Sequence, residues 1–254
     1  MADQQNTGAA EHARRRPFLA AILCGIVTLT ACGSDGVSEP TEPLLPPDAD
    51  VILSASAAAM GNTDSVRFTL TASGSPVYID EFEEIALTSA VGVFKVPGAA
   101  QAVLDVVVSG NLNTQLGAVA LDDEVWLSNP ITGQFETLPP GYDLDPSRFF
   151  DPRGGWQPLM ANLTDATLIG LVERDGQNRY HVTATAPADR IAIITAGLVR
   201  GQDVDIEFWI QPVTGNVRVA EFTTATPEGD VEWLLELDDF GADVEIIPPE
   251  GVQR

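Results

Sequence analysis

Cysteine and histidine are scarce in this chain, which holds two of each in 254 residues. The cysteines are Cys24 and Cys32, and the histidines are His12 and His181. A transition-metal site of these residue types takes about three or four ligands, so we expect no metal site. A nucleophile needs a neighbouring base, and the sequence has no Gly-x-Ser-x-Gly elbow, Cys-x-x-Cys pair or glycine-rich phosphate loop. We therefore expect no catalytic residues, no cofactor and no enzyme.

Basic residues are also few, because 13 Lys and Arg stand against 37 Asp and Glu, a formal net charge of −24. A nucleic-acid binder needs a basic face that displaces counterions from phosphates, so this charge excludes nucleic acid as a partner. Hydrophobic residues make up 44% of the chain, which is enough to bury a core despite the charge. Length and composition together predict one domain of roughly 200 residues plus tails.

The N-terminal apolar run is too short to cross a bilayer, which takes about 20 residues. It extends from Phe18 to Ala31 and follows Arg14-Arg15-Arg16, the layout of a secretory signal peptide. Its end, Leu29-Thr30-Ala31-Cys32, matches the bacterial lipobox, in which the cysteine thiol receives a diacylglycerol before cleavage. We predict a signal peptide at residues 1–31 and acylation of Cys32. Export by the Sec route or by the twin-arginine route stays open.

Residues 32–47 are rich in glycine, proline, serine and acidic residues. This composition predicts a flexible, solvated tether. The folded domain is expected at residues 48–250, held by the lipid anchor at the extracytoplasmic face of the cell membrane.

Apolar and polar residues alternate through most of the chain after residue 61, which predicts strands with one apolar face. The clearest strands cover residues 66–70, 204–210 and 231–237, and further candidates are 85–96, 101–109, 115–121, 124–128, 166–174, 179–185, 217–224 and 244–247. Helical spacing predicts three helices, at 48–61, 156–163 and 186–199. Turns such as Gly110-Asn111 and Asp175-Gly176 link consecutive strands into hairpins. The predicted fold is α+β, a large curved antiparallel sheet of about ten strands packed on a few helices.

The remaining polar features are interpreted as solvated surface. Alternation places His181 with Arg179 and Thr183 on the polar face of its strand, which favours a solvated histidine over a catalytic base. Acidic clusters occur at 81–84, 122–124 and 238–239, without the alternating ligands and glycine of an EF-hand loop. We interpret these clusters as exposed acidic turns that keep the protein soluble.

The segment from Tyr142 to Ala166 has a distinctive order: Tyr142-Asp143, Asp151-Pro152, Gly154-Gly155, Leu159-Met160-Ala161-Asn162-Leu163 and Asp165-Ala166. In this segment and in the lipobox, the chain resembles the LppX/LprAFG family of bacterial, mycobacterial-type lipoproteins. The resemblance extends over about residues 48–249 and includes Asp175-Gly176, Ala220-Glu221-Phe222 and Asp239-Phe240-Gly241. Departures at Pro139-Pro140-Gly141 and in an acidic insertion at 80–84 bear on the cargo, because loops at a cavity mouth usually select the head group.

The resemblance implies an antiparallel half-barrel wrapped on helices around a large apolar cavity, which holds the acyl chains of a lipid or lipoglycan carried across the cell envelope. We expect the cavity lining to come from the apolar faces of strands and helices: Phe68, Leu70, Leu104, Val106, Trp156, Leu159, Met160, Ile191, Ile194, Leu198, Ile206 and Phe208. A neutral di- or triacyl lipid is the expected cargo, since few basic residues are available to neutralise a charged head group. An envelope transport protein is a further expected partner. The alternative is a surface interaction or scaffolding lipoprotein with a solid core, because periodicity does not distinguish a filled core from a hollow one.

Overall fold

The computed structural model describes residues 47–121, 124–138, 153–195, 197–250 and 252, and the side chains of residues 193 and 194 are not among what it describes. The chain divides into two compact units, Met1–Leu44 and Leu45–Arg254, and the described residues all belong to the second. The predicted signal peptide, Cys32 and nearly all of the tether lie outside the described residues. So do Asp122, Asp123 and residues 139–152.

The described residues form three helices and a sheet of twelve strands. The helices are α1 (Ala49–Gly61), α2 (Trp156–Ala161) and α3 (Ala188–Ile194). The strands are β1 (Ser65–Gly74), β2 (Val77–Tyr78), β3 (Ile85–Lys95), β4 (Ala99–Val108), β5 (Leu112–Leu121), β6 (Glu124–Ser128), β7 (Phe135–Thr137), β8 (Thr164–Arg174), β9 (Gln177–Ala186), β10 (Val204–Ile210), β11 (Val217–Thr226) and β12 (Gly229–Asp238).

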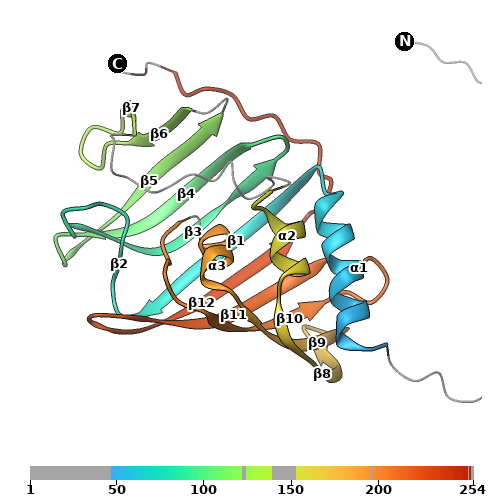
Figure 1. Cartoon of the computed structure of the whole chain (residues 1–254). Coiled ribbons are helices and arrows are strands. Elements are labelled where there is room, and N and C mark those ends of the chain that lie inside the picture. The colour runs from blue at the N-terminus through green and yellow to red at the C-terminus, as the bar shows by residue number, and fades with distance from the viewer. Residues whose placement is uncertain (1–46, 122–123, 139–152, 196, 251, 253–254) are drawn as a thin grey trace, which may run out of the picture. The chain divides into compact units, whose positions relative to one another are not determined.

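The strands form one antiparallel sheet in the order β7-β6-β5-β4-β3-β1-β12-β11-β10-β9-β8, with β2 paired to β3 beside this path. Two meanders of consecutive strands make up the sheet, and β1 joins them by pairing with both β3 and β12. We call β3–β7 the N-terminal meander and β8–β12 the C-terminal meander. The sheet is curved (Figure 1). It is also open, because its end strands β7 and β8 do not pair with each other. The predicted α+β class and curved antiparallel sheet are confirmed.

Tight turns explain why consecutive strands become neighbours. At the β8–β9 turn, Asp175 and Gly176 have φ angles of 54° and 72°. Two successive positive φ values are typical of the type I′ turn, whose twist matches that of the strands it connects. The turn at Gly110 also has positive φ and joins β4 to β5. Local turn chemistry thus sets much of the sheet order.

The helices pack on one face of the sheet, which we call the inner face, and the opposite face is the outer face (Figure 1). α1 contacts α2, and α2 contacts α3. α1 buries Ile52, Leu53, Ser56, Ala57 and Met60, a spacing of three or four residues that places them on one side of a helix. Among the described helices, none combines the length and the apolar character that a membrane span requires.

Several predicted boundaries are wrong. β2 and β7 were not predicted, because segments of two and three residues show no periodicity. The third helix is shorter than predicted, since Ala186 belongs to β9, where it pairs with Val204, and since Gly197 adopts a φ of 88°.

The predicted strand at 244–247 is not a strand. The C-terminal segment instead crosses the outer face, where Lys95 Nζ donates a hydrogen bond to the Val244 carbonyl. Ile246 packs there with Val119 and Trp126 in a small second core. The alternation of apolar residues in this segment therefore reflects packing on the sheet and not pairing within it.

Candidate functional site

The inner face of the C-terminal meander is filled by large apolar side chains. Ile206 and Phe208 on β10 are 1% and 0% exposed, and Leu235 and Leu237 on β12 are each 1% exposed. The helices contribute buried side chains to the same cluster, namely Trp156, Leu159, Met160 and Ile191. Phe68 and Leu70 on β1 complete this region. With Leu104 and Val106 on β4, ten of the twelve predicted lining residues therefore belong to one apolar cluster.

The inner face of the N-terminal meander combines large buried side chains, such as Phe94, Leu104 and Leu116, with a row of small residues. Gly92 pairs with Phe68 and Ala102, and Ala102 pairs with Ala118, so one row across β3, β4 and β5 has no side chain larger than a methyl group. In the next row, Ala100 and Ala120 lie beside Phe94, whose ring stacks on Phe68 with centroids 4.4 Å apart. An added Cβ at Gly92 would lie 2.3 Å from the Gln101 carbonyl oxygen and 2.8 Å from Phe68 Cε1, so the site requires glycine.

Part of this second region is also less covered. Leu104 and Val106, which were predicted to line the cavity, are buried in the main core. Around them lies a set of half-buried apolar residues that pack against that core: Ile85, Ala102, Val108, Ala118, Val125 and Leu127. Sequence reasoning missed this set. The sequence feature that could have indicated this set is the repetition of small residues at alternate positions of neighbouring strands.

The remaining two predicted lining residues, Leu198 and Ile194, are not among the buried residues of the main core. Leu198 is half-buried and packs against the main core. Ile194 ends α3, and its side chain lies outside the described part of the structure.

The polar groups of the inner side are few. Thr224 Oγ1 accepts a hydrogen bond of 2.8 Å from Trp233 Nε1, and Thr195 Oγ1 donates to the Ile191 carbonyl at 3.2 Å. Ser56 on α1 is fully buried, and its Oγ has no hydrogen-bond partner in the structure. Within the described residues, the buried charged side chains are Asp80 and Arg179. Asp80 accepts hydrogen bonds from the backbone N–H groups of Glu84 and Ile85, so it shapes a turn, whereas the rest of the acidic insertion is exposed as predicted.

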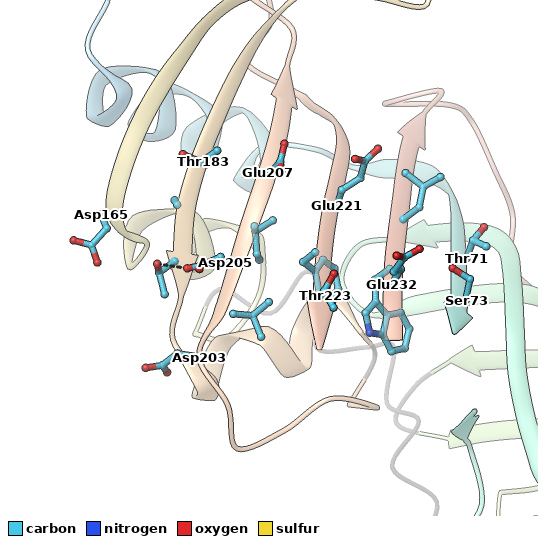
Figure 2. A pocket seen from close by; sticks show the side chains of 17 residues that line it. Thr71, Ser73, Asp165, Thr183, Asp203, Asp205, Glu207, Glu221, Thr223 and Glu232 are labelled. Carbon is cyan, nitrogen blue, oxygen red and sulfur yellow. Dashed lines mark hydrogen bonds between the residues drawn. The ribbon is translucent and has the colours of Figure 1, made fainter. Parts of the chain in front are cut away.

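The outer face has the opposite character. A hollow of about 1030 Å³ lies over β8–β12 and β1 and is lined by carboxylates and hydroxyls (Figure 2). Its carboxylates are Asp165, Asp203, Asp205, Glu207, Glu221 and Glu232. Thr185 Oγ1 donates a hydrogen bond of 2.7 Å to Asp205 Oδ1. No group of three or more His, Cys, Asp or Glu side chains in the described part of the chain has the arrangement of a metal site. A face of this charge favours water and disfavours acyl chains and anions.

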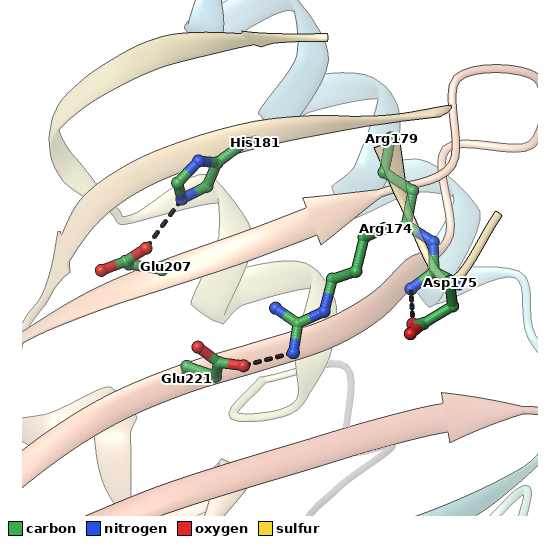
Figure 3. A network of polar contacts seen from close by, with 6 residues as sticks. All are labelled: Arg174, Asp175, Arg179, His181, Glu207 and Glu221. Carbon is green, nitrogen blue, oxygen red and sulfur yellow. Dashed lines mark hydrogen bonds and ion pairs between the residues drawn. The ribbon is translucent and has the colours of Figure 1, made fainter. Parts of the chain in front are cut away.

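His181 lies on this outer face, as alternation predicts, but it is not freely solvated. Its Nε2 is 2.7 Å from Glu207 Oε2, and its side chain is only 18% exposed (Figure 3). The imidazole stacks on Trp209, with ring centroids 4.7 Å apart. The Arg174 guanidinium covers the same indole at 4.0 Å and pairs with Glu221. The interpretation of a solvated histidine is therefore wrong, because cross-strand neighbours that are distant in sequence cover the ring.

One outer-face carboxylate has a shifted pKa. Ser89 Oγ donates a hydrogen bond of 2.6 Å to Asp105 Oδ2, and Gln115 Nε2 donates one of 2.9 Å to Oδ1. Both bonds favour the ionised form, so they lower the pKa of Asp105 below its usual value.

The geometry separates an apolar inner face from an acidic outer face, and comparison with known proteins assigns this arrangement to a family. The model of the LppX_LprAFG lipoprotein family matches residues 48–246. The chain belongs to the LppX_LprAFG lipoprotein family. The predicted family is thus confirmed, and the match covers the whole sheet and all three helices. Among curated proteins, a search finds no significant match to this sequence.

Two solved members share the fold. LprF from Mycobacterium bovis superposes with a TM-score of 0.59 at 20% identity, covering 80% of this chain and 97% of that one. The LppX lipoprotein of Mycobacterium tuberculosis gives a TM-score of 0.55 at 18% identity, covering 78% of this chain and 98% of that one. At this level of identity the comparison establishes the architecture.

Proposed function

We propose that this lipoprotein binds the acyl chains of an envelope lipid or lipoglycan in an apolar cavity between the sheet and the helices, and carries that lipid across the cell envelope. The observation that carries the proposal is the inner face of the N-terminal meander. There, half-buried apolar residues, two of them alanines, pack against the main core, and this supports contact with acyl chains. The cavity lining includes the predicted residues Leu104 and Val106 and, in addition, Ala102 and Ala118.

The energetics favour acyl chains at this surface. Each methylene moved from water to an apolar site contributes about 0.8 kcal/mol. A chain of ordinary lipid length therefore gains several kcal/mol even when part of it stays exposed. The cargo is a neutral di- or triacyl lipid, because the acidic outer face disfavours multiply charged head groups. No cofactor is required, and transfer is passive, toward a receiving membrane or an envelope transport protein.

Anchoring follows from the lipobox. Acylated Cys32 holds the domain at the extracytoplasmic face of the membrane, and residues 32–47 act as the tether. Cys32→Ala is expected to abolish labelling by a fatty acid and to release the protein or leave it uncut. Labelling of this variant at the wild-type level would exclude Cys32 as the anchor.

A scaffolding role is the second candidate, and one observation favours it. On the outer face, Val91 and Val103 are 52% and 47% exposed, on strands that neighbour the small second core. Exposed apolar residues on neighbouring strands are typical of protein contacts. In this case the protein would dock an envelope partner and carry no lipid.

Lipid extraction distinguishes the two functions. The acylated protein is purified from a native-like host, and its bound lipids are identified by mass spectrometry after the covalent anchor is accounted for by peptide analysis. The carrier function predicts stoichiometric, non-covalent acyl lipid. Protein that repeatedly arrives without lipid, and takes up none from liposomes, would contradict the carrier function and favour scaffolding.

A further inference from the structure

Three turns at one end of the N-terminal meander each present a large apolar side chain to solvent. Phe82 lies in the turn between β2 and β3 and is 71% exposed. Leu112 begins β5, directly after the β4–β5 turn, and is 56% exposed. Ile131 lies in the β6–β7 turn and is 90% exposed. Single exposed apolar residues are common on protein surfaces, so a shared function requires that these three lie together.

Strand register brings the three turns to the same end of the sheet (Figure 1). In the β4–β5 turn, Ser109 N–H donates a hydrogen bond of 2.7 Å to the Glu84 carbonyl, which joins this turn to the one between β2 and β3. Gly117 N–H donates a hydrogen bond of 2.7 Å to Ser128 Oγ at the end of β6. Since β6 runs antiparallel to β5, the β6–β7 turn points toward the Leu112 end of β5.

Internal hydrogen bonds hold the turns that carry Phe82 and Ile131. Asp80 Oδ1 accepts a hydrogen bond of 2.7 Å from Ile85 N–H. Asn129 Oδ1 accepts one of 2.9 Å from Ile131 N–H. Because these turns are already ordered, contact with a partner costs less conformational entropy than the ordering of a free loop would.

The same end of the sheet continues the inner face. Leu112 pairs with Val108, and Val108 pairs with Ile85, so these residues form the terminal cross-strand row of β5, β4 and β3. The row lies on the inner face, because Val106, two residues before Val108, is buried in the main core. Ile85 and Val108 are half-buried and pack against that core. Apolar surface therefore extends from the proposed acyl-binding region to the exposed turns.

We propose that Phe82, Leu112 and Ile131 enter the surface of a lipid bilayer when the protein exchanges its lipid. The inference rests on the proposed function, since it names the end of the domain at which acyl chains pass between the bilayer and the inner face. A bilayer is favoured over a protein partner because the three side chains occupy separate turns, whereas the core of a protein interface is one closely packed patch.

The predicted tether allows this contact. Residues 32–47 span at most about 55 Å, whereas a compact domain of this size is roughly 40 Å across. A domain anchored at Cys32 can therefore turn this end of the sheet toward the membrane. Anchoring also keeps the local concentration of bilayer high, so weak insertion of three side chains is sufficient.

Charge restricts the kind of bilayer. Glu81, Glu83 and Glu84 flank Phe82, and all three are exposed. Anionic head groups repel carboxylates that lie within a Debye length, about 10 Å at 0.1 M salt. The favoured surface is therefore a bilayer of zwitterionic lipids, which agrees with the neutral cargo proposed above.

Single-cysteine labelling tests the contact, because the domain at residues 48–250 contains no cysteine and Cys32 is expected to be acylated. Ile131→Cys receives an environment-sensitive fluorophore, and the acylated protein is placed in phosphatidylcholine liposomes that contain a brominated lipid. The matched control is Val213→Cys in the β10–β11 turn, at the opposite end of the sheet, where Val213 is 91% exposed (Figure 1). The label at 131 should be quenched several-fold more strongly than the label at 213. Wild-type protein treated in parallel gives the background.

Phe82→Cys, labelled in the same way, gives a second reading should circular dichroism show that Ile131→Cys is unfolded. Equal quenching at both ends of the sheet, or none at 82 and 131, would overturn the proposal and favour a protein contact at these turns. Replacing part of the phosphatidylcholine by phosphatidylglycerol should weaken quenching at 131. Unchanged or stronger quenching would overturn the preference for zwitterionic lipids.

Lipid extraction from the same samples separates this inference from the proposed function. Bound acyl lipid without quenching at 131 would contradict the membrane contact and leave the carrier function in place. Quenching at 131 in protein that neither carries nor takes up lipid would contradict the carrier function and leave the membrane contact in place.

Discussion

The two meanders have the same number of strands and the same antiparallel connectivity, yet their inner faces differ. The C-terminal meander is filled by large side chains such as Phe208 and Leu235, which are almost completely buried. The N-terminal meander has Gly92, Ala102 and Ala118 in a single row, with half-buried apolar residues around it. Both inner faces contribute to one main core, but the N-terminal meander includes a row of small residues. The proposed function assigns the acyl chains to this part of the sheet.

If the proposed function is correct, this difference separates the packing that holds the helices from the surface that meets the lipid. Buried helix residues pack with the C-terminal meander in the main core. The N-terminal meander leaves apolar surface partly exposed, which costs free energy unless a ligand covers it. Substitutions in the two halves should therefore have different consequences.

The largest expected effect is in the filled half. Phe208→Ala should lower the free energy of unfolding by about 3–5 kcal/mol, because a fully buried aromatic ring leaves a cavity. Leu127→Ala, at a half-buried position of the other meander, should cost only about 1 kcal/mol. Urea unfolding monitored by circular dichroism measures both values. Equal losses would mean that the two halves are packed alike.

Enlarging a small residue tests the same contrast in the opposite direction. Ala220 is fully buried in the C-terminal meander, so Ala220→Phe should overpack the core and destabilise the fold by about 1–3 kcal/mol. Ala118→Phe should change stability by no more than about 0.5 kcal/mol, because Ala118 is only half-buried. A strongly destabilised Ala118→Phe variant, measured in lipid-free protein, would show that this surface is already filled.

Side chains on the outer face of the C-terminal meander should contribute less to the free energy of unfolding than the buried core does. His181→Ala removes a stacking contact with Trp209 and a hydrogen bond to Glu207. We expect a loss of about 0.5–1.5 kcal/mol, as for other stacked aromatic pairs, with no change in lipid content. Thermal unfolding of the variant measures the loss of stability, and lipid extraction measures its lipid content. A loss of bound lipid would connect the outer face to the cargo and contradict the separation of the faces.

The smallest effect is expected on the outer face of the N-terminal meander. Because the pKa of Asp105 is lowered in the folded state, its contribution to stability is present above the unfolded-state pKa and is lost as pH falls through the folded-state pKa. Ser89→Ala removes the hydrogen bond that lowers this pKa most. The variant should lose at most about 0.5 kcal/mol at neutral pH, and still less in acid below the folded-state pKa of Asp105. A pH series of urea midpoints tests this trend, and an undiminished loss in acid would exclude Asp105 as its cause.

The sequence predicted those parts of the fold that local chemistry determines. Alternation located most strands, and Asp175-Gly176 predicted its hairpin because both residues tolerate positive φ. The same alternation occurs in both meanders, so it did not show which inner face is filled. That distinction depends on side-chain size across neighbouring strands, as in the row from Gly92 to Ala118, and therefore on register.

Long-range pairing also explains what was missed on the outer face. Glu207 approaches His181 from a different strand, 26 residues further along the chain. Likewise, Ile246 reaches Trp126 only because the C-terminal segment crosses the sheet. Ten of the twelve predicted lining residues lie in the main core, and their role as a cavity lining stays a prediction.

The most direct test of the central claim compares two tryptophans on opposite faces of the N-terminal meander. Ala118→Trp places an indole on the inner face, and Val103→Trp places one on the outer face, where Val103 is 47% exposed. Non-covalent lipid occupancy of both variants and of wild type is measured by native mass spectrometry of protein from the same host. The account predicts that Ala118→Trp lowers occupancy at least fivefold, while Val103→Trp retains the wild-type level. Full occupancy in Ala118→Trp, or an equal loss in both variants, would contradict the claim that acyl chains lie on this inner face.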